Sequence, residues 1–109
     1  MRFAILAIAL AACQSSDVSR ELGARCDSSD ECDERCLLPD ADWPGGFCTI
    51  HCETDVDCPS GAVCLEEEGG VCAFACGIDA ECGFLGTGYA CKERDARGGA
   101  GKRMVCRGG

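Results

Sequence analysis

The chain has 109 residues, a formal net charge of −9 and 13 cysteines. The strong negative charge argues against a general affinity for nucleic acid. Cysteine makes up about 12% of the chain, a level typical of disulfide scaffolds that are exported to an oxidising compartment. Few large apolar residues follow the amino-terminal segment, so covalent cross-links must replace much of the missing core.

Residues 1–12 combine an early arginine with an apolar run that is too short to span a bilayer as a helix. This pattern is typical of an export signal, which takes no part in the mature fold. The run ends in Leu10-Ala11-Ala12-Cys13, which resembles the bacterial lipobox. The resemblance implies cleavage of the leader before Cys13, attachment of diacylglycerol to its sulfur and, often, acylation of the new amino terminus.

Cysteine counting agrees with lipidation of Cys13. The twelve other cysteines form an even number and divide into three sets of four. The alternative, an ordinary secretory signal, would leave an odd thiol in an oxidising compartment. Because two or more acyl chains anchor a protein stably, we expect a protein anchored to the envelope of a bacterium. Gln14, in place of an aspartate, resembles the sorting signal of outer-membrane lipoproteins, although inner-membrane retention stays open.

The polar remainder of residues 13–25 predicts a flexible tether between the anchor and the folded part. Three copies of one four-cysteine pattern follow, in residues 26–51, 52–75 and 76–109, and each begins with C-x5-C. The predicted fold class is therefore a small disulfide-rich protein. It consists of three tandem units with short β-hairpins and turns, little regular secondary structure, and a rod-like arrangement. The cysteines expected to form disulfides are Cys26, Cys32, Cys36, Cys48, Cys52, Cys58, Cys64, Cys72, Cys76, Cys82, Cys91 and Cys106.

The five residues between the first two cysteines of each unit predict a short capped turn. The third of them can cap by accepting a hydrogen bond from an amide two or three residues on, and the last is always acidic. These positions are Ser29, Asp55 and Asp79, followed by Glu31, Asp57 and Glu81. Calcium binding is the alternative, but no twelve-residue loop with a closing bidentate glutamate follows.

Short apolar runs around glycine-containing loops predict one β-hairpin in each unit. The clearest has Ala62–Leu65 and Val71–Phe74 on either side of the loop. Four cysteines allow three pairings. We favour first with third and second with fourth, because this pairing ties the turn to both strands, while a direct Cys64–Cys72 bridge stays possible.

Charge is distributed unevenly along the chain. Residues 52–75 hold six acidic residues and no base, whereas residues 76–109 hold six bases and four acids. A solvated surface is the favoured interpretation and a charge-guided contact the alternative. The glycine-rich loop at residues 97–101 is expected to be accessible, so Arg97, Lys102 and Arg103 are candidate binding residues. Trp43 and Phe47 form either a local core or an exposed binding anchor.

The segments Cys26-Asp-Ser-Ser-Asp-Glu-Cys32 and Asp57–Cys64 resemble the amino-terminal cysteine-rich region of Dickkopf-type proteins and, more loosely, EGF-like repeats. Predicted bacterial cysteine-rich lipoproteins carry similar units. The chain lacks the adjacent Cys-Cys pair and the second domain of Dickkopf proteins, so a Wnt-related role is not implied. The resemblance implies an extracellular binding or spacer module and no catalysis.

Rival chemistries have weaker sequence support. Cys48-x2-His51-Cys52 has residue types that bind zinc, but the chain has no C-x2-C pair and its thiols are expected to be oxidised. Redox catalysis usually requires C-x-x-C, and His51 is the only histidine. We therefore expect no cofactor and no enzyme activity. The leading hypothesis is a membrane-anchored binding or spacer lipoprotein with an unknown protein or surface partner. A secreted inhibitor-like or toxin-like knot is the alternative, and a metal or redox protein is the third.

Overall fold

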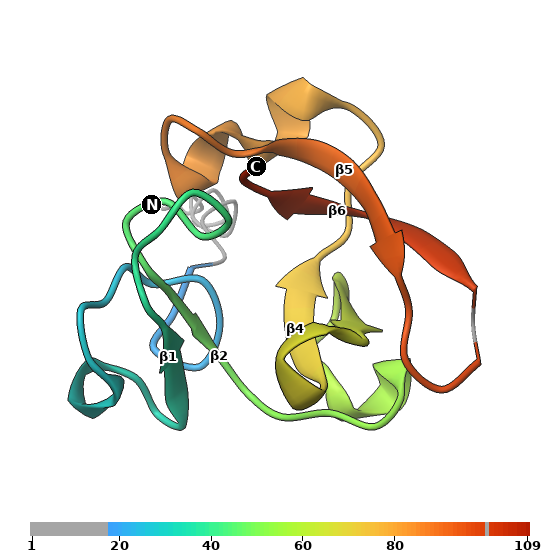
Figure 1. Ribbon diagram of the computed structural model, residues 1–109, viewed down its shortest axis with the longest axis horizontal. Helices are drawn as coiled ribbons and strands as arrows, with labels where there is room; N and C mark the ends of the chain where they lie inside the picture. Colours follow the sequence, from blue (N-terminus) through green and yellow to red (C-terminus); the bar gives the residue numbers. More distant parts are fainter. Residues whose placement is uncertain (1–17, 100) are drawn as a thin grey trace, which may run out of the picture.

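The computed structural model describes residues 18–99 and 101–109 (Figure 1). The predicted leader, residues 1–12, and the predicted lipidation site, Cys13, lie outside these ranges. Within them, every helical segment is too short and too polar to cross a bilayer.

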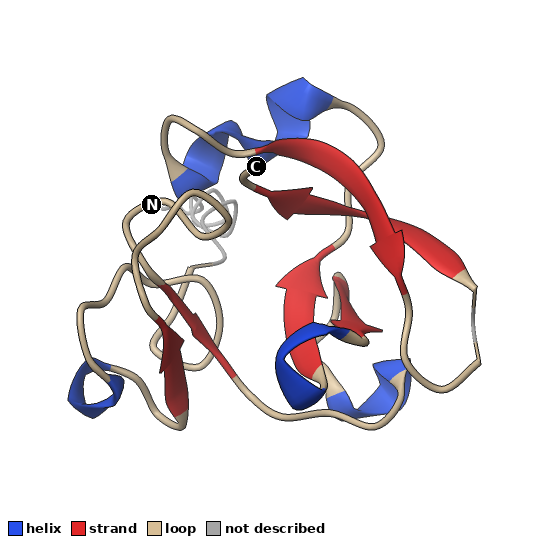
Figure 2. Cartoon of the chain, viewed as in Figure 1, coloured by secondary structure: helices blue, strands red, loops and turns tan. Residues whose placement is uncertain are grey.

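Each predicted unit contains a 3-10 helix followed by a two-stranded antiparallel hairpin (Figure 2). Unit 1 consists of η2 (Ser29–Glu31), β1 (Arg35–Leu37) and β2 (Phe47–Thr49). Unit 2 consists of η3 (Asp55–Asp57), β3 (Ala62–Leu65), η4 (Glu67–Gly69) and β4 (Val71–Phe74). Unit 3 consists of η5 (Asp79–Leu85), β5 (Ala90–Asp95) and β6 (Lys102–Arg107). These elements confirm the predicted fold class of stapled hairpins and turns.

Two disulfides cross-link every unit, first cysteine with third and second with fourth. They are Cys26–Cys36, Cys32–Cys48, Cys52–Cys64, Cys58–Cys72, Cys76–Cys91 and Cys82–Cys106. Cys64 and Cys72 are register partners across the hairpin, yet each bonds to a cysteine beside the 3-10 turn. The direct Cys64–Cys72 bridge is therefore wrong. The disulfides close loops with sequence separations from 10 to 24. In the chain-entropy model, each such disulfide stabilises the folded state by about 3 kcal/mol.

The 3-10 turns are held against the hairpins by one repeated hydrogen bond. The side chains of Ser29, Asp55 and Asp79 accept from the backbone N–H of the third cysteine of their unit, at 3.2, 2.9 and 2.9 Å. The predicted turns are correct, but the predicted acceptance from an amide two or three residues on is wrong. Each of these residues opens its turn and faces a hairpin amide instead, so the bond fixes the turn to the strand.

The acidic residue that ends each turn makes the second repeated bond. Glu31 accepts from the backbone N–H of Asp27 at 2.6 Å, and Asp57 accepts from that of Glu53 at 2.8 Å. Glu81 makes the equivalent contact in unit 3. These amides lie at the start of a helical turn, where backbone donors have no intrahelical partner and attract negative charge.

The described part of the predicted tether is bound to unit 1 rather than flexible. Leu22 is only 2% exposed and belongs to the apolar core. The N–H of Gly23 donates to the carbonyl of Cys48 at 2.8 Å, and the N–H of Cys48 donates to the carbonyl of Ala24 at 2.9 Å. Burial of the leucine stabilises this arrangement. The tether prediction is therefore wrong from Ser19 onward.

The units fold back on one another instead of forming a rod. Figure 1 shows β5 and β6 above β4 of unit 2, with the C-terminal end of β6 directed toward unit 1. Ala75 and Val105 form an antiparallel bridge between units 2 and 3. The N–H of Gly108, just after β6, donates to the carbonyl of Asp42 in unit 1 at 2.9 Å. Unit 3 thus contacts both other units, which a rod of sequential repeats would not allow.

One apolar core is shared by all three units. Phe47 from unit 1, Leu65 from unit 2 and Val105 from unit 3 are each 0% exposed and belong to the same cluster. The ring of Phe47 lies 6.2 Å from that of Phe74 and 6.4 Å from that of Tyr89. Each unit alone has too little apolar surface for a core, so pooling these side chains stabilises the whole chain.

Candidate functional site

Trp43 and Phe47 are buried core residues and not exposed binding anchors. Their exposures are 2% and 0%, and their ring centroids are 5.0 Å apart. The alternative of a local core is the one the structure supports, although that core extends to the other units. The two glycines before Phe47 turn the chain back after Trp43, which brings both rings to the same side. Phe47 therefore offers no surface to a partner, whereas Trp43 does so only where its side chain lines the cavity described below.

The arginines of the basic loop are paired within the chain. Arg97 lies 3.1 Å from Glu53 and 3.5 Å from Glu66, while Arg103 lies 2.6 Å from Asp55. All three acids belong to unit 2, so the uneven charge distribution reflects attraction between units 2 and 3. Arg97 and Arg103 already have partners within the chain, and contact of these two residues with an external partner stays a prediction.

Lys102, the third basic candidate, faces its own hairpin partner. Its Nζ donates to Asp95 Oδ1 at 2.6 Å across the β5–β6 register. This hydrogen bond raises the pKa of Lys102 and lowers that of Asp95. Both side chains are well exposed, at 60% and 67%, so the pair adds little to stability. Its charge is matched, which weakens the prediction of Lys102 as a free binding cation.

We expect acid to lower the stability of the fold, and the Asp57→Asn substitution to reduce this loss. Hydrogen bonds from the amides of Glu53 and then Thr54 hold the pKa of Asp57 below its usual 3.8. A depressed pKa in the folded state contributes stability that is present above the unfolded pKa and lost as pH falls through the folded value. Urea unfolding between pH 6 and pH 2.5 should therefore show a shallower acid loss for this variant than for wild type.

A matched control is Asp27→Asn. The side chain of Asp27 accepts no hydrogen bond among the described residues, so its acid dependence should equal that of wild type. Equal acid dependence in the Asp57→Asn protein would contradict a role for this carboxylate in fixing the turn.

Arg107, at the end of β6, joins all three units and was not among the predicted residues. Its guanidinium donates to Glu67 of unit 2 at 2.6 and 3.0 Å and to Asp42 of unit 1 at 3.2 Å. It also lies 5.4 Å from the ring of Trp43, within cation–π range. The side chain is only 9% exposed. Burial alone would lower the pKa of Arg107, but the paired carboxylates outweigh it, so the pKa is raised.

His51 and the neighbouring cysteines do not form a zinc site in this oxidised fold. Cys48 bonds to Cys32, and Cys52 bonds to Cys64. The Nε2 of His51 lies 2.7 Å from the Glu53 carboxylate. Across the described residues, every group with three possible metal ligands consists of disulfide-bonded cysteines. Because metals bind the thiolate form, the oxidised cysteines offer no ordinary ligand.

The carboxylates considered for calcium have other partners. Asp55 accepts from the amide of Cys64 and pairs with Arg103, whereas Asp57 accepts from the amides of Glu53 and Thr54. Their oxygens thus fix the turn and attach unit 3. For these residues the structure favours hydrogen bonding to backbone amides over calcium ligation.

A surface cavity at the junction of units 1 and 2 is the best candidate for a binding site. Its volume is about 300 Å³, and the residues that line it are Arg35, Cys36, Leu37, Leu38, Asp40, Trp43 and Glu68. This size is at the lower end for pockets that hold small molecules. The β1 strand supplies the buried Leu37, and the loop between β3 and β4 supplies Glu68 from the other unit.

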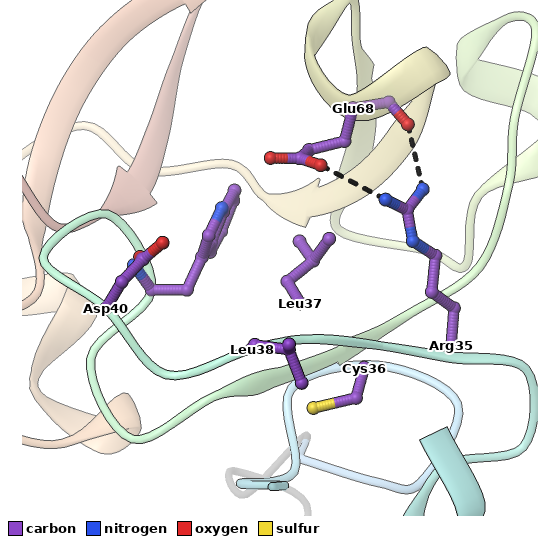
Figure 3. Close-up of a pocket in the computed structure, with 7 residues that line it drawn as sticks. Arg35, Cys36, Leu37, Leu38, Asp40 and Glu68 are labelled. Atoms are coloured by element: carbon purple, nitrogen blue, oxygen red, sulfur yellow. Dashed lines mark hydrogen bonds and ion pairs between the residues drawn. The ribbon is translucent and has the colours of Figure 1, made fainter. Parts of the chain in front are cut away.

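One ion pair closes the cavity on the unit 2 side. Arg35 Nη2 lies 3.1 Å from Glu68 Oε1, and Arg35 Nη1 donates to the Glu68 carbonyl at 2.8 Å (Figure 3). Glu68 has a φ of 54°, which makes it the one described non-glycine residue in the left-handed region. Such a conformation is costly and persists where neighbouring contacts maintain it. Arg35 provides two such contacts and thereby fixes the carboxylate at the rim.

Polar groups also face the opposite part of the cavity. Asp40 Oδ1 accepts from the amides of Asp42 and Trp43 at 2.9 and 3.0 Å. Trp43 Nε1 is buried and has no hydrogen-bond partner among the described residues. Buried donors without a partner are uncommon in folded proteins. The cavity therefore combines an apolar floor, two carboxylates and one paired guanidinium, and Trp43, one of its lining residues, carries a buried unsatisfied donor.

Sequence patterns alone did not reveal this cavity. Glu68 belongs to a run of three glutamates that reads as a solvated hairpin loop, and Arg35 is the single base of unit 1. Arg35 and Glu68 are 33 residues apart in the sequence, so their proximity depends on how unit 2 packs against unit 1. The one local signal was the placement of a base in an otherwise acidic unit.

Tyr89 is another buried side chain with an unsatisfied polar atom among the described residues. Its hydroxyl has no partner there, and burial raises its pKa to about 12. The phenol therefore stays protonated at neutral pH. With its ring packed near Phe47, it acts as part of the core.

Searches of protein-family models, curated proteins and solved structures found no significant match to this chain. Functional inference therefore depends on the chain's own residues and their geometry.

Proposed function

We propose that this protein is an extracytoplasmic lipoprotein, anchored to the bacterial envelope through Cys13, whose folded part is a non-catalytic binding module. The observation that carries the proposal is the disulfide count. All twelve cysteines of the three units pair within their own unit. Cys13 is thus left over from pairing, and Leu10-Ala11-Ala12-Cys13 resembles a lipobox.

The six disulfides are consistent with an extracytoplasmic location, because cytosolic reductants keep most thiols reduced. The bound segment that starts at Ser19 also limits the distance from an anchor at Cys13. Only five residues separate these two positions, and six residue steps reach at most about 20 Å when extended. The folded body is therefore expected close to the membrane surface, at about half the distance a free tether would permit.

A binding role agrees better with the described chemistry than catalysis does. The only histidine pairs with Glu53, and its side chain is 53% exposed. The basic side chains of the hairpin loop pair with acids of unit 2. By contrast, the junction cavity has an apolar floor and polar groups that are only partly satisfied, which are the usual features of a small-ligand site.

Membrane partitioning of the full chain tests the anchor. Wild-type protein, expressed in a bacterium from its own leader, should enter the detergent phase and the membrane fraction, because two or more acyl chains give stable anchoring. The Cys13→Ser variant should appear in the aqueous phase with its disulfides intact. Wild-type protein in the aqueous phase would contradict the anchor and favour a secreted disulfide knot.

A further inference from the structure

The junction cavity has the chemistry of a receptor for a positively charged amine. We propose that it binds an alkylammonium group on a short apolar stem, such as a lysine side chain, with the ammonium between Asp40 and Glu68 and the stem over Leu37 and Trp43. This inference deepens the binding role proposed above and rests on it. It does not depend on the membrane anchor.

The floor of the cavity suits the apolar stem. Leu37 and Trp43 are 3% and 2% exposed, so they are held firmly by the core and present fixed surfaces to the cavity. Leu38 at the edge is 59% exposed and offers apolar surface that a bound stem would cover.

The carboxylates suit the ammonium. Glu68 uses Oε1 to accept from Arg35, and its second oxygen has no partner among the described residues. In Figure 3 that second oxygen points away from Arg35. Asp40 uses Oδ1 for two amides and likewise has its other oxygen available. With one guanidinium against two carboxylates, the cavity carries a formal charge of −1, and an ammonium donates in three directions.

Trp43 Nε1 favours a ligand that also carries an acceptor. This atom is buried without a partner in a side chain that lines the cavity, and an indole N–H can only donate. A lysine within a peptide supplies both an ammonium and backbone carbonyls. A free alkylamine supplies the ammonium alone. The two sources of the same chemistry should therefore differ in affinity.

The position of Glu68 is fixed before any ligand arrives. Its left-handed backbone is maintained by the two hydrogen bonds from Arg35, and strained residues that are held in this way cluster at binding sites. Arg35 thus acts as a positioning residue. Rigid placement of the carboxylate lowers the ordering cost of binding.

Fluorescence of Trp43 gives a direct readout, since it is the only tryptophan in the chain. The purified, oxidised full-length protein in detergent is titrated with Nα-acetyl-lysine methylamide, with n-butylamine and with the uncharged Nα-acetyl-norleucine methylamide. We expect saturable changes with both amines, tighter binding of the lysine derivative, and affinity for the norleucine derivative lower by about tenfold or more. Equal binding of both amines would also support the site, with a free amine as its ligand.

Variants separate this cavity from general charge attraction. Glu68→Gln and Asp40→Asn should each weaken lysine binding about fivefold, and added salt should weaken it further. The matched control, Glu66→Gln, removes a charge from the same loop but faces Arg97, so it should leave affinity unchanged. Absence of saturable binding, equal affinity for the norleucine derivative, or an equal effect of Glu66→Gln would overturn the proposal.

Failure here would not be confused with failure of the anchor. The same preparations are scored for detergent partitioning, which depends on Cys13 and not on the cavity. None of the substituted positions is a cysteine, so each variant should keep all six disulfides and its fold. Thermal unfolding of each variant checks this.

Discussion

Replacing Cys82 and Cys106 by alanine should lower the free energy of unfolding more than replacing Cys26 and Cys36. The first pair closes a loop of sequence separation 24 and the second a loop of 10. Chain entropy alone predicts losses of about 3.4 and about 2.7 kcal/mol. Cys82 and Cys106 are also 0% exposed within the shared core, where the removed sulfurs leave cavities that add to the loss.

Urea unfolding followed by Trp43 fluorescence measures both variants. Trp43 lies in unit 1, whereas the Cys82–Cys106 bridge lies in unit 3. If the three units share one core, removal of the distant bridge shifts the whole Trp43 transition. A Trp43 transition that stays at the wild-type midpoint in the Cys82→Ala/Cys106→Ala protein would mean that the units unfold independently.

Arg107→Ala is the second substitution with a large expected effect. It leaves the Glu67 carboxylate, 20% exposed, without its closest counter-ion and removes the cation beside Trp43. Removing one partner of a buried pair is strongly destabilising. Because Glu67 retains Arg94 at 3.4 Å and some solvent contact, we expect the free energy of unfolding to fall by about 2 kcal/mol, less than for a fully buried pair.

A matched comparison is Arg20→Ala. The Arg20–Asp33 pair is separated by 3.6 Å, and both side chains are about 60% exposed, so its loss should cost about 0.5 kcal/mol or less. Combining Arg107→Ala with Glu67→Gln should recover part of the stability, because the stranded charge is then removed as well. Similar losses for Arg107→Ala and Arg20→Ala in urea unfolding would contradict the role of Arg107 as the tie between units.

The local structure could be predicted because it depends on short-range spacing. The C-x5-C segments set the 3-10 turns, and the apolar runs at Ala62–Leu65 and Val71–Phe74 became β3 and β4 as expected. The pairing of first with third and second with fourth cysteine also followed from the requirement that a turn be tied to two strands. These features need only contacts within about 25 residues.

Long-range features could not be predicted in the same way. The placement of unit 3 on unit 2 depends on pairs such as Arg97–Glu53 and Arg103–Asp55, which are 44 and 48 residues apart. Charge counts showed an acidic middle and a basic end, but not that they attract each other within one molecule. Trp43 likewise reads as an anchor or a core residue until Phe47 and Arg107 are placed beside it.

Because the three units fold back on one another, the surfaces available to a partner differ from those expected from the sequence. The sequence predicts that the loop between β5 and β6 is the most accessible element. In the structure, Arg97 and Arg103 of this hairpin instead form ion pairs with acidic residues of unit 2. The junction of units 1 and 2 is the place where a cavity, a fixed carboxylate and an unsatisfied indole donor coincide. Recognition is thus expected between units, where no single repeat could provide it.

The most direct test of the account is the intact mass of the mature protein extracted from membranes. We predict the mass of residues 13–109, less the twelve hydrogens lost in six disulfides, plus diacylglycerol and, where the amino terminus is modified, one further acyl chain. Without reduction, a thiol-alkylating reagent should add no mass. A chain that starts elsewhere, carries no lipid or reacts with the reagent would contradict a disulfide-stapled lipoprotein anchored at Cys13.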